Sequence, residues 1–402
     1  MTSEWHEVPL RELVGYISKG IAPSYAEEAS ETTIRVLNQK CNRNFRISYG
    51  DSRLHDTLKK KVPPERYVKP DDILINSTGA GTAGRIAQIE DVPSATTIDG
   101  HMILIRSNRK VTQKFLGYAL KAHQWEVLQL DEGSTGQTEL NRDRLLDEIM
   151  INYPVSFDEQ NAIVGTLESI DRKLIVNEQL NDNLEQQAQA IYHERFETVS
   201  PNDLPSDWRI VTLGEVATIS NKSFNPLKEP EILLEHYSIP AFDEARFPVF
   251  ELSTSIKSNK FIIDASCFMI SKLNPTTKRV WKPYCLTGNA VCSTEFIVYK
   301  AKDQSITDFL YSVIDSGSFS DFMCSHVTGS TGSRQRTTPS DTLSYELILP
   351  SEDELAEFQS LVSPMYAQMR INAIENDKLK RLRDSLLPKL MSGEIDVSSV
   401  HL

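Results

Sequence analysis

The sequence predicts an α+β fold built from two similar modules and two long helices that pair with each other. Three observations lead to this prediction. The segment that begins at Trp5 returns at Trp208, the residues "GSTG" at 133–136 return at 329–332, and a seven-residue hydrophobic repeat follows each module. Self-similarity at a fixed displacement is the signature of a repeated structural unit, so the chain reads as one arrangement written twice.

Composition is that of an ordinary globular protein. The 402 residues suffice for two or three domains, and 40% hydrophobic and 25% charged residues are typical values. No apolar run approaches the length of a membrane span, and "MTSEWHEVPL" has no signal segment, so we expect a cytoplasmic protein without a membrane role. The five cysteines have no C-x-x-C spacing, which argues against a disulfide framework and against a zinc site.

Charge is unevenly distributed along the chain. The net charge of −13 weighs against a nucleic-acid partner. However, residues 35–66 hold nine Lys or Arg against three acids, and residues 257–282 hold six against one. Solvated faces would explain either basic segment alone, but less well why both fall at comparable places in the two halves. Local basic surfaces on an acidic scaffold are compatible with binding a polyanion.

Each module opens and closes in the same way. "WHEVPLRELVGYIS" and "WRIVTLGEVATIS" share Trp, Val, Leu and Glu at equal spacing, and a strand-like run closes on Pro154 in one half and on Pro350 in the other. Between these ends lie short β-like runs ("DDILIN", "HMILIRS", "SCFMISK", "EFIVYKA") and helical stretches such as "QKFLGYALKAHQWEVLQL". This mixture predicts α+β modules.

A long amphipathic helix follows each module. Ser156-x-x-Glu159 and Ser351-x-x-Glu354 have the form of capping boxes. The 4-3 spacing of the seam is the same in both copies, with two asparagines at matching places, and a polar seam residue fixes the register of paired helices. The expected pairing residues are Ile163, Leu167, Ile170, Leu174, Asn177, Asn181, Leu184, Phe358, Val362, Met365, Met369, Asn372, Asn376 and Leu379.

Each helix is expected to run for about 40 residues, or roughly 60 Å. The first ends before the linker-like "TVSPNDLPSDW", and we expect Pro388 to stop the second. Two similar modules with basic segments are thereby held apart by a rod of approximate two-fold symmetry. Such a spacer suits DNA recognition by paired modules, whose half-sites lie roughly 34 Å apart for one helical turn.

The glycine-rich stretch "DDILINSTGAGTAGRIA" contains G-x-G-x-x-G at Gly79, Gly81 and Gly84, and Asp99 follows at the distance of a ribose-binding carboxylate. A dinucleotide fingerprint needs a helix directly after the glycines. Pro93 and the β-rich run after it leave no room for one, so we predict a glycine-rich loop between two strands. This excludes a nicotinamide enzyme.

The chain resembles the DNA-specificity subunits of type I restriction-modification systems over essentially its whole length. The resemblance is carried by W-x-x-V-x-L-x-E at each module start, by "DDILIN" with its glycine loop, and by "GSTG" ahead of "L…I…P" in both halves. "FDEQNAIVGTLESIDRKLIVN" and "LRDSLLPKLMSGEI" complete it. Singly these motifs are weak, but their ordered duplication is specific.

The resemblance implies two target-recognition domains, each reading one half of a bipartite, asymmetric DNA sequence. It implies spacer helices that pair as an antiparallel coiled coil, set the gap and dock two modification subunits. The expected limits are 1–154 and 208–350 for the recognition domains, 155–198 and 351–392 for the spacer helices, 199–207 for the linker and 393–402 for the C-terminal tail. S-adenosylmethionine and adenine methylation belong to the modification partner, and ATP and Mg to the restriction subunits. This chain is expected to be a non-catalytic subunit without a cofactor or metal.

Candidate DNA-binding residues come from the basic segments and from two pairs of polar loops, "STGAGTAGR" with "SKLNPTTKRVW" and "GSTGQTELNR" with "GSTGSRQRTT". Their donors suit phosphate or base contacts. A solvated loop is as good an explanation for any single residue. The candidates are Lys40, Arg43, Arg46, Ser77, Thr78, Thr82, Arg85, Gln137, Thr138, Asn141, Lys272, Asn274, Thr276, Lys278, Arg279, Ser333, Arg334, Gln335 and Arg336.

Catalytic signatures are missing from the sequence. There is no N-P-P-Y or D-P-P-Y of an amino-methyltransferase, no Walker A motif and no H-E-x-x-H. His101 beside Asp99 is interpreted as a structural side chain, because no partner constellation supports acid–base chemistry. The alternative to the DNA reading is a coiled-coil scaffold that binds proteins without DNA, which the acidic net charge slightly favours.

Overall fold

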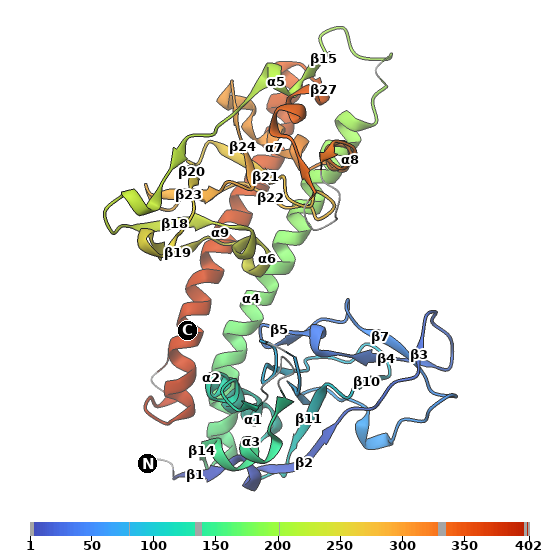
Figure 1. Ribbon diagram of the computed structural model, residues 1–402, viewed down its shortest axis with the longest axis vertical. Coiled ribbons are helices and arrows are strands. Elements are labelled where there is room, and N and C mark those ends of the chain that lie inside the picture. Colours follow the sequence, from blue (N-terminus) through green and yellow to red (C-terminus); the bar gives the residue numbers. More distant parts are fainter. Residues whose placement is uncertain are drawn as a thin grey trace. The chain divides into compact units, whose positions relative to one another are not determined.

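The computed structural model describes residues 4–79, 81–132, 139–200, 202–328, 335–397 and 400. The chain forms two compact units (Figure 1). Unit 1 consists of Met1–Lys173 together with Lys380–Leu402, and unit 2 of Leu174–Leu379. The chain therefore returns to its N-terminal unit after completing the second one.

Unit 1 contains two four-stranded sheets. The central sheet is antiparallel and has the order β2-β11-β8-β9: Val14–Lys19, Met102–Ser107, Ile73–Asn76 and Ile86–Gln88. The outer sheet has the order β10-β4-β7-β3: Thr96–Ile98, Thr33–Leu37, Arg53–Asp56 and Tyr25–Ala26. Shorter pairs are β1 (Trp5–Pro9) with β14 (Met150–Pro154), β5 (Asn42–Arg43) with β6 (Arg46–Ile47), and β12 (Asp131–Glu132) with β13 (Glu139–Leu140). The helices are α1 (Gln113–Ala122), α2 (Gln124–Val127) and α3 (Arg142–Glu148).

Unit 2 repeats this plan. Its central sheet has the order β16-β24-β21-β22: Ala217–Ile219, Phe296–Ala301, Cys267–Ser271 and Val280–Trp281. The outer sheet has the order β17-β20-β23-β18-β19: Ser223–Phe224, Lys260–Ile262, Ala290–Ser293, Leu233–Tyr237 and Val249–Leu252. β15 (Arg209–Thr212) pairs with β27 (Glu346–Leu349), and β25 (Val327–Thr328) with β26 (Arg336–Thr337). The helices are α5 (Leu213–Val216), α6 (Ile239–Ala245), α7 (Thr307–Ile314) and α8 (Gly317–Ser325).

The repeat extends to strand direction. In the outer sheets β4 is parallel to β10 and antiparallel to β7, while β18 is parallel to β23 and antiparallel to β19. The predicted α+β fold with an internal repeat is thus confirmed. The four β-like runs named from the sequence are the strands β8, β11, β21 and β24, which form the middle of the two central sheets.

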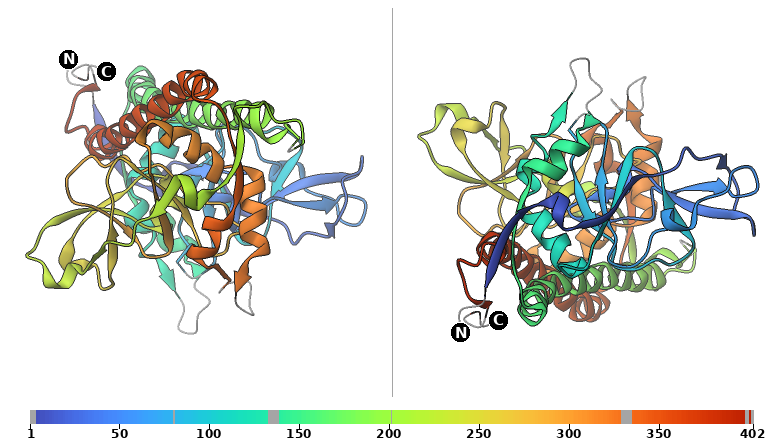
Figure 2. Two further views of the ribbon diagram at one scale, coloured as in Figure 1. Left: turned by 90° about the horizontal axis from the view of Figure 1, so that it is seen from above. Right: turned by 90° about the horizontal axis from the view of Figure 1, so that it is seen from below.

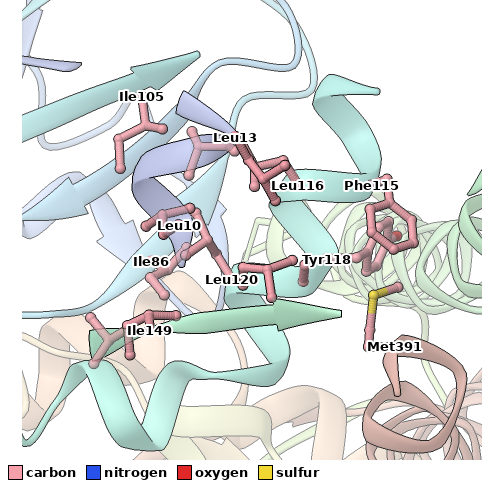
Figure 3. Packing of buried hydrophobic residues seen from close by; sticks show 14 of the residues in the cluster. Leu10, Leu13, Ile86, Ile105, Phe115, Leu116, Tyr118, Leu120, Ile149 and Met391 are labelled. Atoms are coloured by element: carbon pink, nitrogen blue, oxygen red, sulfur yellow. The ribbon is translucent and has the colours of Figure 1, made fainter. Parts of the chain in front are cut away.

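The main core of unit 1 lies between its central sheet, α1 and the two long helices. Leu10, Ile105 and Phe115 are fully buried in it, and Figure 3 shows Met391 directed toward Phe115. Gly393 follows at φ +74°, where a Cβ atom would lie 3.0 Å from the Trp5 ring. The C-terminal segment is therefore part of the core of unit 1, held by apolar burial.

Two long helices, α4 (Phe157–Tyr192, 36 residues) and α9 (Glu352–Met391, 40 residues), pass through both units (Figures 1 and 2). At each start a serine Oγ, of Ser156 or Ser351, accepts a hydrogen bond from the backbone N–H three residues on, at 3.4 Å. The expectation that Pro388 stops the second helix is wrong. α9 continues to Met391, because its end is set by the left-handed backbone at Gly393, which is a favoured helix stop.

The helices run antiparallel in each unit. In unit 1 Ile163 and Leu167, early in α4, share a buried cluster with Leu387 and Leu390, late in α9. In unit 2 the residue numbers along α9 decrease as those along α4 increase. Asn177 is hydrogen-bonded to Asn376, and Asn181, four residues later, is hydrogen-bonded to Asn372. The predicted pairing of the two helices as an antiparallel coiled coil is confirmed.

The units do not coincide with the predicted domain limits. They divide each long helix, between residues 173 and 174 and between 379 and 380. The predicted limits of 1–154 and 208–350 leave the helices outside the recognition domains, and as functional boundaries they stay a prediction. Among the residues described, no helix is both long enough and apolar enough to span a membrane.

Candidate nucleic-acid interface

The glycine-rich loop of unit 1 connects two strands. Residues 77–85 follow β8 and lead directly into β9, with no helix after the glycines among the residues described. Gly79, Gly81 and Gly84 all have positive φ angles, of 113°, 70° and 84°, which glycine adopts without strain. A Cβ atom at Gly84 would lie 2.9 Å from the carbonyl oxygen of Val127, so this glycine also allows α2 to approach the loop.

This loop contacts the strand β13, which follows the first "GSTG" in the sequence. The backbone N–H of Leu140 donates to the carbonyl of Ser77 at 2.8 Å, and Thr78 forms a β-bridge with Glu139. The two polar loops of unit 1 that were singled out from the sequence are therefore adjacent. We call this contact the loop junction of unit 1, formed by residues 77–78 and 139–140.

Unit 2 builds the same contact from different residues. The loop after β21 joins β26, where the Thr337 N–H donates to the Lys272 carbonyl at 3.1 Å and Leu273 bridges Arg336. Residues 272–273 and 336–337 form the loop junction of unit 2. The two junctions correspond because Asn76 and Ser271, which pair with Met102 and Phe296, precede them in equivalent positions.

The side chains of the unit 1 loop differ in what they can offer. Ser77 is fully buried and its hydroxyl has no hydrogen-bond partner among the described residues, so it is not available to a ligand at the surface. Thr78 is hydrogen-bonded to Nδ1 of His101 at 2.8 Å. Thr82 donates to the carbonyl of Gly79 at 3.3 Å, and Arg85 to that of Gly81 at 3.2 Å, so both stabilise the loop from within.

A basic hairpin lies beside this loop. The turn of β5–β6 consists of Asn44 and Phe45, both with positive φ, as two-residue hairpin turns require. Arg43 and Arg46 face each other across the two strands, with Arg43 exposed. The buried amide of Asn42 attaches the hairpin to the loop by donating to the carbonyl of Arg85 at 2.8 Å. Lys40, three residues before Arg43, is exposed.

Carboxylates hold three candidate cations of unit 2. Lys278 lies 2.8 Å from Oδ1 of the buried Asp315. Arg279 binds Asp243 through Nε and Nη2, at 2.6 and 2.9 Å. Arg336 binds Glu295 in the same side-on manner, at 2.9 and 3.0 Å. The positive charges of these three side chains are therefore balanced by neighbouring carboxylates, which also fix the orientation of the two guanidinium groups.

The remaining candidates have varied positions. Asn141 caps α3 by accepting from the N–H groups of Asp143 and Arg144. Asn274 has a positive φ of 48° and its N–H donates to the carbonyl of Gln335, while Thr276 is exposed. Gln137, Thr138, Ser333 and Arg334 lie outside the described residues. A role of any candidate in DNA binding stays a prediction.

Sequence patterns did not reveal the carboxylates that hold these cations. Asp243, Glu295 and Asp315 lie 36 to 41 residues from their partners along the chain and carry no local motif.

Burial raises the pKa of Asp315 to about 6, and Lys278 opposes that increase. His101 donates its backbone N–H to Asp99 at 2.9 Å, so this pair is part of the loop scaffold.

The pairing residues of the helices lie mostly in the interior. Asn177, Asn372 and Asn376 are buried, whereas Asn181 is half-buried. Ile163, Leu167, Ile170, Leu174, Phe358 and Val362 are buried, and Leu184, Met365, Met369 and Leu379 are half-buried. No group of three or more His, Cys, Asp or Glu side chains in the described part of the chain is arranged to hold a metal ion.

Comparisons with known proteins agree with this architecture. Residues 2–186 match the family model of the type I restriction modification DNA specificity domain. The specificity subunit of the type I restriction enzyme MjaIX from Methanocaldococcus jannaschii is 24% identical over 384 residues, 88% of this chain and 84% of the relative. That of HindI from Haemophilus influenzae is 32% identical over 93 residues, 23% of this chain and 20% of the relative.

A solved structure shares the fold. The S subunit of a type I restriction-modification system from M. genitalium superposes with a TM-score of 0.58 at 16% identity, covering 97% of this chain and 96% of that one. Its likeness extends through both modules and both long helices. Residues 2–186 thus match the specificity domain, and over most of its length the chain is similar to type I restriction-modification DNA-specificity subunits, one of which shares its fold.

Proposed function

We propose that this chain selects a bipartite, asymmetric DNA sequence, with one half-site bound at the loop junction of each unit. The repetition of this junction carries the proposal. Both junctions join the loop after the third strand of a central sheet to a short hairpin strand, by the same backbone hydrogen bond and the same bridge. Different side chains occupy equivalent positions, as expected when one scaffold reads two different sequences.

The paired helices act in this proposal as the spacer between half-sites. Their register sets the number of unspecified base pairs, because the half-sites must match the distance between the junctions. Register is held in unit 2 by Asn177–Asn376 and Asn181–Asn372, which are hydrogen bonds of defined geometry in an otherwise apolar seam.

Docking of two modification subunits on the helices is the second part of the proposal. Several large apolar side chains of unit 2 lie on α4 and α9 but outside the seam. Val176 and Leu180, one turn apart on α4, are 49% and 39% exposed, and Ile371 on α9 is 55% exposed. Exposed apolar surface of this kind favours a protein partner.

In this proposal the catalytic activities belong to the partner subunits. The chain itself is non-catalytic. S-adenosylmethionine and adenine methylation would be supplied by the modification subunits, and ATP and Mg by the restriction subunits. The specificity chain determines where these activities are directed.

The decisive experiment is a genome-wide map of N6-methyladenine in a host that expresses the cognate modification subunit, with and without this chain. We expect a bipartite motif with a fixed gap only when the chain is present. If the complex assembles and no motif depends on the chain, the DNA-reading proposal fails and the protein-binding scaffold becomes the better explanation.

Salt dependence separates the same alternatives in vitro. Binding to duplex DNA through phosphate contacts releases counterions, so the affinity must fall steeply as salt increases. Insertion of one heptad between Leu184 and Ile191, matched by one in α9, should lengthen the gap and leave both half-sites unchanged. An unchanged gap would show that the helices do not measure it.

A further inference from the structure

A turn of unit 1 carries three consecutive lysines that the candidate interface leaves unused. Residues 57–61, "TLKKK", follow β7 in the outer sheet and contribute three of the nine basic residues between 35 and 66. We call residues 57–61 the basic turn. Lys59, Lys60 and Lys61 are exposed, and Leu58 directly before them is 78% exposed. The basic turn therefore presents an apolar side chain next to several positive charges.

The backbone of the basic turn is held by the last residue of β7. Oδ1 of Asp56 accepts hydrogen bonds from the N–H groups of Leu58 and Lys59, at 2.9 and 3.4 Å. The carbonyl of Asp56 accepts from the N–H of Lys60 at 3.2 Å. An aspartate that binds the backbone two residues further on is a common way to fix a turn. Leu58 is thus exposed on a turn of defined shape.

A buried histidine anchors the end of the turn. Nδ1 of His55 accepts from the N–H of Ser24 at 2.9 Å, so Nε2 carries the proton and donates to the carbonyl of Lys60 at 2.7 Å. The ammonium group of Lys60 donates to the carbonyl of Ala22 at 2.8 Å. Lys60 therefore supports the turn. A site that is fixed beforehand loses less conformational entropy when it binds a partner.

The other two lysines can accept an external anion. The side chain of Lys59 is 68% exposed, and its Nζ lies 3.9 Å from Oδ2 of Asp56, beyond hydrogen-bond distance. The side chain of Lys61 forms no hydrogen bond or ion pair with the described part of the chain. Within that part, neither lysine pairs with the exposed glutamates of the adjacent connection 27–31. Both positive charges are accordingly available at the surface.

Strand β7 connects the basic turn to the candidate interface of unit 1. The strand begins beside the segment 38–40, where Nδ2 of Asn38 donates to the carbonyl of Asp51 at 2.7 Å. The same segment is attached to the glycine-rich loop, since Nδ2 of Asn76 donates to the carbonyl of Gln39 at 3.1 Å. The four residues of β7 span roughly 13 Å, which is the length of about four base pairs of duplex DNA. The basic turn thus lies at the opposite end of this strand from the interface.

Unit 2 does not repeat this concentration of charge. Strand β19 corresponds to β7, because each is the antiparallel neighbour of the equivalent strand, β18 or β4. The chain after β19 reads "STSIKSN" at 253–259 and contains one lysine, Lys257. A contact made by three clustered lysines is therefore specific to unit 1.

We infer that the basic turn binds the sugar–phosphate backbone of DNA outside the half-site of unit 1, with Lys59 and Lys61 on phosphates and Leu58 against the deoxyribose beside them. Lysines that neutralise phosphates supply affinity without sequence preference. Proteins that contact the minor groove also place apolar side chains among their cations. This inference rests on the proposed function and extends the DNA contact to one flank of the target.

The test uses the complex of this chain with its modification subunit and a duplex that contains the mapped target sequence. Equilibrium binding is measured from roughly 50 to 200 mM salt for wild type and for Lys59→Ala/Lys61→Ala. The slope of log K against log salt concentration should become less steep by about two, because each lost phosphate contact removes roughly one. Discrimination between base pairs of either half-site should stay at the wild-type level.

Shortened duplexes test where the contact lies. Each flank is removed in turn up to the border of its half-site. The affinity that Lys59→Ala/Lys61→Ala loses on the long duplex should disappear when one flank is absent and persist when the other is absent. Leu58→Ser should lower affinity by about 5-fold without changing the salt slope, because an apolar contact releases no counterions.

Two further variants control for charge and folding. Lys110, paired with Glu12 at 3.4 Å, and the exposed Lys228 lie outside the candidate interface. Lys110→Ala/Lys228→Ala removes the same net charge and should keep the wild-type slope. Lys59→Arg/Lys61→Arg retains both charges in the basic turn and should also keep it.

The outcomes separate the inference from the proposed function. If no bipartite motif depends on the wild-type chain, the proposed function itself fails. If the wild type gives a motif and Lys59→Ala/Lys61→Ala keeps the wild-type slope, only the inference is overturned. The same holds if that variant assembles less well with the modification subunit at an unchanged slope, because the turn then contacts protein. A reduced slope whose effect on affinity depends on one flank supports the inference.

Discussion

Asn177 on α4 donates a hydrogen bond from Nδ2 to Oδ1 of Asn376 on α9, at 2.9 Å, and both side chains are buried. Asn372 donates likewise to Asn181, at 2.8 Å. Asn177 and Asn372 hold the same place in the repeat, as do Asn181 and Asn376. Each asparagine of one copy therefore pairs with the other asparagine of the second copy, which is the relation that an internal two-fold axis produces in unit 2.

Removal of one partner in this seam is expected to destabilise the protein. Asn177→Ala leaves the buried amide of Asn376 without its donor, and an unsatisfied buried polar group costs about 1–3 kcal/mol. The free energy of unfolding, measured by urea denaturation of the full chain, should fall by that amount. Asn183 is exposed on the same helix, so Asn183→Ala should change stability by less than about 0.5 kcal/mol. Equal effects of the two variants would contradict a role of the seam pair.

A partly buried charge cluster connects α1 with both long helices inside unit 1. Asp171 accepts from Tyr118 and Lys121, at 2.8 and 3.0 Å, and from Arg383 at 3.0 Å. Burial by itself raises the pKa of Asp171, but the charges of Lys121 and Arg383 outweigh it and hold the pKa below its usual value. The carboxylate is therefore ionised and compensates two cations that are little exposed.

Asp171→Ala should consequently cost roughly 3 kcal/mol or more, because it leaves Lys121 and Arg383 without their common counter-charge. Glu168 is a suitable control. It lies one turn away and binds Lys114 at 2.6 Å, but that pair is more exposed. Glu168→Ala should lower the free energy of unfolding by about 1 kcal/mol or less. A loss at Asp171 no larger than that at Glu168 would show that the cluster does not hold unit 1 together.

The glycines of the loop can be told apart by what a side chain would meet. Alanine at Gly81 or at Gly84 must adopt a positive φ, which costs roughly 1–2 kcal/mol. At Gly81 the added Cβ has no atom within 4 Å, whereas at Gly84 it lies 2.9 Å from the carbonyl oxygen of Val127. We expect Gly84→Ala to reduce stability clearly more than Gly81→Ala in the same denaturation experiment. Equal losses of stability would mean that α2 can move away from the added Cβ atom without a free-energy penalty.

The sequence predicted those features that depend on local periodicity or on the repeat. Heptad spacing and the matched asparagines predicted two long helices that pair, and the alternation after Gly84 predicted a strand in place of a nucleotide-binding helix. The end of α9 was misjudged because the helix continues past Pro388 to Met391, and the positive φ of Gly393 follows directly after it.

Contacts between distant residues were beyond such reasoning. Ser77 looked like a surface donor, but its position after a central strand directs it into the interior. The partners of Lys278, Arg279 and Arg336 are set by how the sheets and helices of unit 2 pack, and nothing near these residues in the chain indicates them. Only the fold shows that these cations are held by carboxylates.

Asp315 gives unit 2 a distinct dependence on pH. The carboxyl is 1% exposed, and burial raises its pKa from 3.8 to about 6, while Lys278 and Arg246 oppose the increase and Glu185 adds to it. Between pH 4 and 6 the folded state therefore holds a proton that the unfolded state has lost. Stability falls as pH increases wherever the folded state binds more protons, so this group is most favourable at low pH and becomes a penalty above pH 6. The difference between the two pKa values corresponds to roughly 3 kcal/mol.

Asp315→Asn removes this titration, and its stability relative to wild type should increase from pH 4 to pH 6.5 and then level off. Asp264→Asn is the matched control. Partial burial raises the pKa of Asp264, but hydrogen bonds from Lys300 and Ser266 lower it to about 2, so this carboxyl is ionised across the whole range. Its substitution should give a difference from wild type that does not change between pH 4.5 and 6.5. A constant difference for Asp315→Asn as well would show that the buried carboxylate remains ionised beside Lys278, and that their ion pair outweighs the cost of burial.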